Sequence, residues 1–219
     1  MKLERDNFII KCEDELPYIN EAVDYLEQKM KDVMDFFELD SLDKKINIVV
    51  WNDLEDYKKH IEEYFEYKDY MRADTNDGNI NLLSIEEAHK THEHANMTKD
   101  ELKSTILHEY VHICQQNSEL EHIKNEIAWF WEALATNLGN PDKFKKISIK
   151  ATNTEIKDFN SLKDNYFIAF TIGNYMLENY SHEEILKYIK YPSKLLDDEN
   201  KILDEAREWS NSVVKGVRK

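Results

Sequence analysis

The pattern of apolar and polar residues predicts short β-strands in the first part of the chain. FIIKC at 8–12 is a short apolar run, and KINIVVW at 45–51 is a β-branched run bounded by polar residues. In NINLLS at 79–84, Ile80 and Leu82 alternate with polar positions, which predicts a further strand at the edge of a sheet. We therefore expect a small sheet in this part of the chain.

Apolar residues that recur every three or four positions predict helices in most of the remaining chain. The segment 15–39 has this period at six positions: Ile19, Val23, Leu26, Met30, Val33 and Phe37. Capping boxes predict that two helices begin at Thr98 and at Ser181. Further helices are expected at about 54–67, 125–138, 160–180 and from 193 to the C-terminus.

The order of these elements predicts an α+β fold. Strands and helices come first and helices alone follow, which indicates a small mixed β-sheet in the N-terminal half and a helical C-terminal half. Only 4 Gly and 3 Pro occur in 219 residues, so few turns are encoded. The chain has no internal repeat and no clear linker, and we predict a single domain over residues 1–219.

Charge and cysteine content exclude several classes of function. A net charge of −16 disfavours nucleic acid or an anionic membrane surface as the main partner. Cys12 and Cys114 are far apart, so neither a disulfide framework nor a thiolate metal site is indicated. The chain has no run that resembles a signal peptide or a membrane span, and we predict a cytoplasmic protein without a membrane partner.

The segment STILHEYVHICQQ at 104–116 contains the pattern His-Glu-x-x-His, formed by His108, Glu109 and His112. On a helix, residues four apart lie on one face, so both imidazoles can bind one cation. A catalytic zinc site needs three protein ligands and leaves a fourth position for water. The alternative is a buried helix whose histidines only form hydrogen bonds with their neighbours.

Glu132 is the candidate third ligand. It lies within WFWEALATNL, where the residues around it are apolar. Burying an unpaired carboxylate costs several kcal/mol, so a glutamate at this position indicates a cation or a strong hydrogen-bond donor. Two histidines and one glutamate with an open position suit Zn2+ best, and zinc is the predicted cofactor.

The two segments H-E-Y-V-H at 108–112 and W-E-A-L-A at 131–135 resemble the gluzincin group of zinc metallopeptidases, which includes thermolysin. The resemblance implies a zincin-like fold in which His108, His112 and Glu132 bind zinc and Glu109 activates a water molecule. It also implies an edge strand that pairs with extended substrate, and 79–84 has the expected place in the chain. Such enzymes stabilise the oxyanion with a Tyr or His after the third ligand, which favours Tyr166 over Tyr175.

The chain departs from this family in two respects. Trp131 stands where an asparagine often precedes the glutamate ligand, and no acidic residue can be identified that would bind a substrate's amino group. The predicted activity is therefore hydrolysis of a peptide bond within a peptide or protein substrate. The alternatives are a non-catalytic domain of the same fold that binds a peptide or partner, and a regulatory peptidase with one protein target.

Other polar residues are assigned lesser roles. His89, His92 and His94 fit no metal-binding pattern, and the segment 86–97 is predicted to be a polar loop. Three isolated histidines have charged neighbours and are predicted to lie on the surface: His60, His122 and His182. Thr136 or Asn137 could form a hydrogen bond with a metal ligand.

Overall fold

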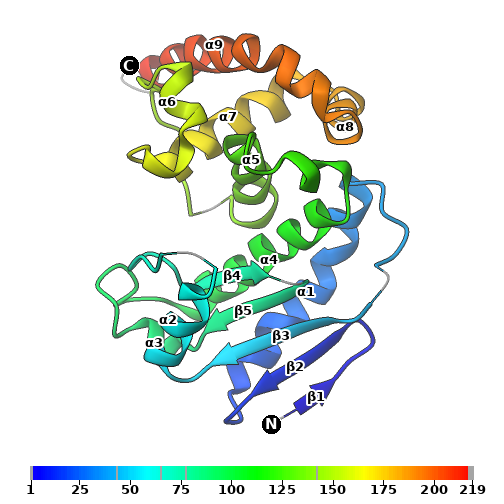
Figure 1. The fold of residues 1–219 in the computed structure, drawn as a ribbon, viewed down its shortest axis with the longest axis vertical. Coiled ribbons are helices and arrows are strands. Elements are labelled where there is room, and N and C mark those ends of the chain that lie inside the picture. Colours follow the sequence, from blue (N-terminus) through cyan, green and yellow to red (C-terminus); the bar gives the residue numbers. More distant parts are fainter. Residues whose placement is uncertain (1, 43, 65, 77, 142, 217–219) are drawn as a thin grey trace. The chain divides into compact units, whose positions relative to one another are not determined.

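The computed structural model describes residues 2–42, 44–64, 66–76, 78–141 and 143–216. The chain forms two compact units: a sheet unit, Met1–Met34 with Leu39–Ile113, and a helical unit, Asp35–Glu38 with Cys114–Lys219. The predicted single domain stays a prediction. The boundary at Ile113 falls inside one continuous helix, α4 (Lys99–Gln116), which carries the His-Glu-x-x-His segment (Figure 1).

The described strands form one mixed sheet, and the protein has the predicted α+β class. The strand order is β1-β2-β3-β5-β4, in which β2, β3 and β5 are parallel and the two outer strands are antiparallel to their neighbours. The strands are β1 (Lys2–Glu4), β2 (Phe8–Cys12), β3 (Ile46–Trp51), β4 (Ala73–Asn76) and β5 (Asn79–Leu83). The predicted strands at 8–12, 45–51 and 79–84 are confirmed as β2, β3 and β5.

One face of the sheet is apolar and buried. The parallel register aligns its side chains in rows, because residues paired across neighbouring strands point to the same side. This face consists of Phe8, Ile10, Cys12, Ile46, Ile48, Val50, Ile80 and Leu82. Figure 1 shows α1 (Pro17–Phe36) and α4 on one side of the sheet, and the ring of Tyr110 on α4 lies 6.4 Å from that of Phe8. Helix α4 is therefore fixed on the sheet by its apolar face.

The opposite face of the sheet carries hydrogen-bonded polar side chains. Asn47 donates to Asn79 at 2.8 Å, and Asn81 donates to Asp74 at 3.0 Å. Helix α2 (Leu54–Glu62) follows β3, and α3 (Ile85–Ala88) follows β5. Helix α2 ends five residues before the predicted position of about 67, and its N-terminus is capped by Asp53, whose carboxylate accepts from the backbone N–H of Asp56.

The prediction that 79–84 forms an edge strand is wrong. Strand β5 lies between β3 and β4, and the strand at that edge of the sheet is β4. The segment that forms β4, ADTN, contains only one β-branched residue, so its sequence gives little strand signal. Its conformation comes from antiparallel pairing with β5, in which Thr75 lies opposite Ile80 and Asp74 opposite Asn81.

The helical unit follows the predicted order of helices. Two predicted helices are confirmed as α5 and α7, and the one predicted from 193 to the C-terminus begins at Pro192; residues 217–219 lie outside the described residues. The capping box at Ser181 is present, with Glu184 as its partner. The described elements are η1 (Glu119–Ile123), α5 (Ala128–Gly139), α6 (Asn153–Lys157), η2 (Phe159–Ser161), α7 (Asn165–Asn179), α8 (His182–Lys190) and α9 (Pro192–Gly216).

Helices α5 and α7 approach each other closely at Gly173. A Cβ atom at this glycine would lie 2.5 Å from the carbonyl oxygen of Ala133 and 2.2 Å from the side-chain nitrogen of Asn137. The same Asn137 nitrogen donates to the carbonyl oxygens of Ala133, at 2.8 Å, and Phe170, at 3.0 Å. This close packing fixes α5, the helix that carries Glu132, within the helical unit.

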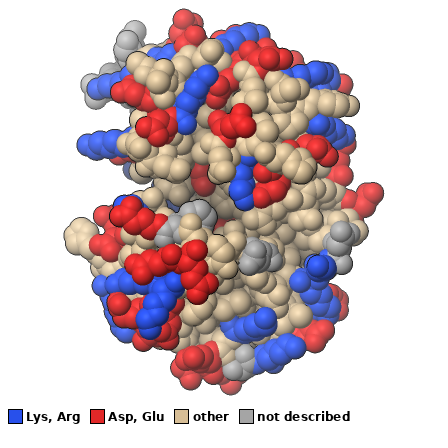
Figure 2. All heavy atoms as spheres, in the orientation of Figure 1, with Lys and Arg blue, Asp and Glu red and all other residues tan. Residues whose placement is uncertain are grey.

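Charged residues of both signs are interspersed on the surface. Figure 2 shows Lys and Arg side chains among Asp and Glu side chains on the visible face of each unit, although acidic residues predominate in the sequence. Among the described residues, none of the helices combines the length and the apolar character that crossing a membrane requires.

Candidate metal centre

Helix α4 brings two imidazole rings together. The predicted capping box begins this helix: the Thr98 hydroxyl accepts from the backbone N–H of Glu101 at 3.1 Å, and the Glu101 carboxylate accepts from that of Thr98 at 2.8 Å. His108 and His112 follow one turn apart, and their Nε2 atoms are 3.1 Å from each other. The two rings are nearly perpendicular, at 88°. Both nitrogens thus point toward one position beside the helix.

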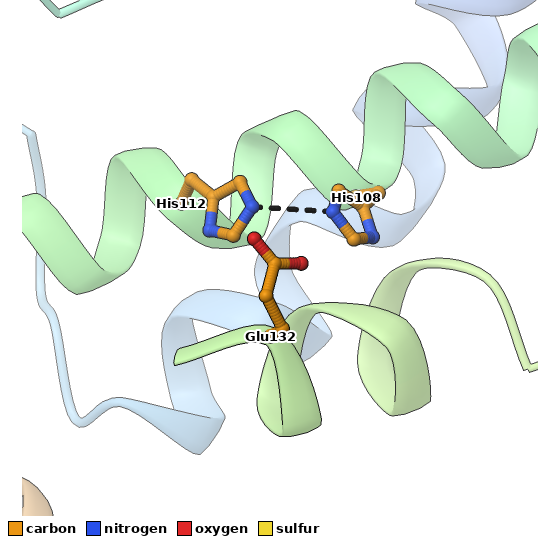
Figure 3. Close-up of side chains that lie close together, drawn as sticks. All are labelled: His108, His112 and Glu132. Atoms are coloured by element: carbon orange, nitrogen blue, oxygen red, sulfur yellow. Dashed lines mark hydrogen bonds between the residues drawn. The ribbon is translucent and has the colours of Figure 1, made fainter. Parts of the chain in front are cut away.

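Glu132 on α5 completes a group of three. Figure 3 shows its carboxylate directed at the two imidazole rings, and one ligand atom from each residue lies within 4.8 Å of the others. His108 and Glu132 are half-buried, and His112 is buried. Among the residues that the structure describes, no other group of three His, Cys, Asp or Glu side chains converges in this way.

A hydrogen bond next to Glu132 holds its backbone. Gln115, in the last turn of α4, is fully buried and its side-chain nitrogen donates to the carbonyl oxygen of Trp131 at 2.9 Å. Gln115 lies three residues after His112 on one helix, and Trp131 directly precedes Glu132. This hydrogen bond therefore joins the last turn of α4 to the start of α5 within the helical unit.

The three side chains fit a zinc ion by donor type and by spacing. Zinc binds imidazole nitrogen and carboxylate oxygen at about 2.0–2.2 Å, so two ligand atoms in tetrahedral geometry are about 3.3 Å apart. The two histidine nitrogens are 3.1 Å apart, and all three ligand atoms lie within 4.8 Å. The group thus offers three ligands of the predicted kind.

Glu109 lies directly after His108 on α4 and is buried, with 7% of its surface exposed. Its carboxylate oxygen Oε2 accepts a hydrogen bond of 2.7 Å from the hydroxyl of Thr75, on the edge strand β4. The same hydroxyl lies 3.1 Å from the backbone carbonyl oxygen of Glu109. Thr75 carries no signal in the sequence, because only the pairing of β4 with β5 brings it to α4.

A polar cluster near Glu109 was also missed. Asp74 accepts hydrogen bonds from Asn81 and from the His60 ring, the latter at 3.3 Å. Burial raises the pKa of the Asp74 carboxyl, although His60 and the hydrogen bonds oppose this shift. Burial also raises the pKa of the Tyr57 hydroxyl well above its ordinary value, and the negative charges of Asp74 and Glu109 add to the effect. Strand β4 thus brings the carboxyl group of Asp74 close to the ionisable side chains of His60 and Tyr57.

The two candidate oxyanion residues have different surroundings. Tyr166, in the first turn of α7, stacks on Phe144 with ring centroids 6.4 Å apart and contacts the edge of Phe159. Tyr175 is buried, and its hydroxyl donates to the carboxylate of Glu205 at 2.8 Å. The Tyr175 hydroxyl is thus used within the helical unit, and Tyr166 remains the candidate.

The two candidates for contact with a metal ligand have structural roles. The Thr136 hydroxyl donates to the backbone carbonyl of Glu132 at 2.6 Å and contacts the carbonyl of Ala133. Asn137 joins α5 to α7 as described above, and it also accepts from Asn174. The hydrogen bonds described for these residues involve backbone groups and Asn174, and none involves the Glu132 carboxylate.

The remaining histidines do not converge. His89 donates to the carbonyl oxygen of Met97, and the ring of His92 is almost fully exposed. His122 and His182 lie on the surface, as predicted, but the prediction for His60 is wrong. The His60 ring stacks on Trp51 at 5.0 Å and only 16% of its side-chain surface is exposed.

Comparison with other proteins adds no assignment. No protein-family profile matches the chain, and a search among characterised proteins finds no match.

Proposed function

We propose that the protein is a zinc-dependent peptidase with a zincin-like fold that hydrolyses a bond within a peptide or protein substrate. The observation that carries this proposal is the convergence of His108, His112 and Glu132, with Glu109 on the same helix turn as the histidines. A binding module that only holds a peptide has no need of a carboxylate at this position. The site therefore supports catalysis better than simple binding.

The metal and the protein have separate tasks. When bound, zinc lowers the pKa of a coordinated water to about 7 and polarises a carbonyl group. Glu109 takes a proton from the water while the oxygen of the water attacks the carbonyl carbon of the substrate. Glu109 then gives that proton to the nitrogen of the departing amine. The peptide bond breaks, and one water molecule is consumed.

Two further groups have proposed roles in this reaction. The Tyr166 hydroxyl would donate to the oxyanion that forms on the attacked carbonyl. Strand β4 would pair with the backbone of an extended substrate, a role assigned to 79–84 in the sequence analysis. The hydrogen bond between Thr75 of β4 and Glu109 supports this revision, because a peptide paired with β4 would then lie beside the general base.

The first experiment measures metal content. Protein purified without added metal is analysed by elemental mass spectrometry as wild type, Glu132→Ala and a control, Glu126→Ala, whose side chain is exposed and close in sequence. We expect one zinc per chain in wild type and control, and loss of zinc in Glu132→Ala. Wild-type protein that holds no zinc, even after zinc is supplied, would overturn the proposal.

The second experiment tests hydrolysis with a broad peptide library. Wild type should cleave peptides, while Glu109→Gln should keep its zinc and lose at least about 100-fold in rate, the usual contribution of a general base. Cleavage by the variant at the wild-type rate would contradict the mechanism. A wild-type enzyme that cleaves only one peptide would identify a regulatory peptidase, and a zinc protein that binds peptides without cleaving them would identify a binding domain.

A further inference from the structure

We propose that Thr75 is a positioning residue for Glu109: its hydroxyl holds Oε2 of the carboxylate, so that Oε1 is the oxygen that carries the proton. This inference rests on the proposed function, and it assigns to the edge strand a task besides pairing with substrate. All of the contacts involved lie within the sheet unit.

The register of β4 directs Thr75 toward α4. Thr75 pairs with Ile80, and residues paired in an antiparallel sheet point to the same side. Ile80 belongs to the buried apolar face on which α4 packs. Asp74 and Asn76 therefore point to the opposite face, where Asp74 contacts His60 and Asn81. A shift of β4 by one residue would replace the Thr75 hydroxyl with a neighbouring side chain of different chemistry.

The hydroxyl of Thr75 contacts two oxygens of one residue. It lies 2.7 Å from Oε2 and 3.1 Å from the backbone carbonyl of Glu109, and the shorter distance indicates the stronger hydrogen bond. A hydroxyl has one hydrogen, which it donates to the carboxylate while its position is fixed between both acceptors. This arrangement restricts the rotation of a glutamate side chain that has three rotatable torsions.

The contact is compatible with both protonation states of Glu109. As a carboxylate, Glu109 accepts from Thr75 through Oε2, and Oε1 accepts the proton of the attacking water. After that transfer the proton is on Oε1, while Oε2 is the carbonyl oxygen of the acid and still accepts from Thr75. The side chain therefore need not reorient before it gives the proton to the leaving amine. The benefit is in the chemical step and not in substrate binding.

The test uses three variants at one position. Thr75→Val keeps the shape and removes the hydroxyl, while Thr75→Ser and Thr75→Ala both remove the methyl group and only Ser keeps the hydroxyl. On a peptide identified from the library, we expect kcat to fall about 10- to 100-fold in Thr75→Val and Thr75→Ala, as for other residues that orient catalytic groups. KM and zinc content should stay close to wild type, and kcat of Thr75→Ser should stay within about threefold of wild type. If Thr75→Val fails to fold, the comparison of Thr75→Ala with Thr75→Ser gives the same answer.

A binding measurement tests the same contact without catalysis. Acetohydroxamate binds zinc and can donate a hydroxyl hydrogen to a carboxylate, so its affinity for the zinc protein, measured by calorimetry, reports the position of Glu109. Thr75→Val should weaken binding, and in a Glu109→Gln background the same change should have no further effect. Equal kcat and equal acetohydroxamate affinity in wild type and Thr75→Val would overturn this inference alone. A wild-type protein that neither holds zinc nor cleaves peptides would overturn the proposed function as well.

Discussion

Two segments of the sheet unit contain several histidines, and the histidines are arranged differently in each. In the segment 86–97, His89 and His94 each contact a different part of the chain, and His92 lies in solvent. On α4, which begins two residues after this segment, His108 and His112 point toward each other, and their Nε2 atoms are 3.1 Å apart. The number of histidines therefore indicates little about metal binding.

The difference follows from secondary structure and not from composition. A helix holds residues four apart on one face, so the orientation of His108 and His112 is set before any metal binds. In the loop, the His94 ring accepts from Arg72 through Nδ1, because a guanidinium can only donate. Its Nε2–H donates to the carbonyl oxygen of Tyr70 at 2.9 Å. Both ring nitrogens of His94 are thus used to attach the loop to the start of β4.

The largest effect is expected from His112→Ala. A structural zinc site binds its metal with about 10–16 kcal/mol shared among its ligands, so the loss of one ligand should weaken affinity by about 100-fold or more. Competition with a chromophoric chelator measures this change. If the variant binds zinc as tightly as wild type, α4 does not differ from the loop in the way proposed.

A smaller effect of a different kind is expected from His94→Ala. The variant removes one buried and one part-buried hydrogen bond and leaves the Arg72 guanidinium and the Tyr70 carbonyl with one partner fewer. The cost should be about 1–3 kcal/mol in the free energy of unfolding, with a lower Tm and unchanged zinc affinity. Differential scanning calorimetry and the chelator titration separate the two quantities. Loss of zinc at an unchanged Tm would show that the loop takes part in the metal site.

The smallest effect is expected from His92→Ala. The His92 side chain is 93% exposed, and its one described ion pair, with the neighbouring Glu93, is long at 3.7 Å. Both the free energy of unfolding and the zinc affinity should change by less than about 0.5 kcal/mol. The variant is the matched control for the other two substitutions. A fall in zinc content here would contradict the contrast between the two segments.

Local signals in the sequence were sufficient for the site helix and insufficient for its surroundings. The capping box at Thr98 and the spacing of His108 and His112 are properties of one helix, and both are present as predicted. Glu132 could be selected because a carboxylate among apolar residues requires a partner. These features need no information on tertiary structure.

The edge strand and its contacts could not be predicted in this way. The sequence ADTN has weak strand propensity, and β4 forms because β5 offers a partner. The hydrogen bond from Thr75 to Glu109 joins residues 34 positions apart. The burial of His60 depends likewise on Trp51, which lies on a different element. Contacts that pairing and packing create leave no periodic pattern in the sequence.

The shortness of β4 also has a consequence for the solubility of the protein. A sheet edge that accepts a substrate strand can equally accept a strand from another copy of the chain, which is a route to aggregation. Strand β4 has only four residues. A short edge offers too few backbone hydrogen bonds for stable pairing between two folded copies. Under the proposed function, a peptide substrate would gain further contacts from the neighbouring metal site, and the edge would then favour a substrate over a second copy of the chain.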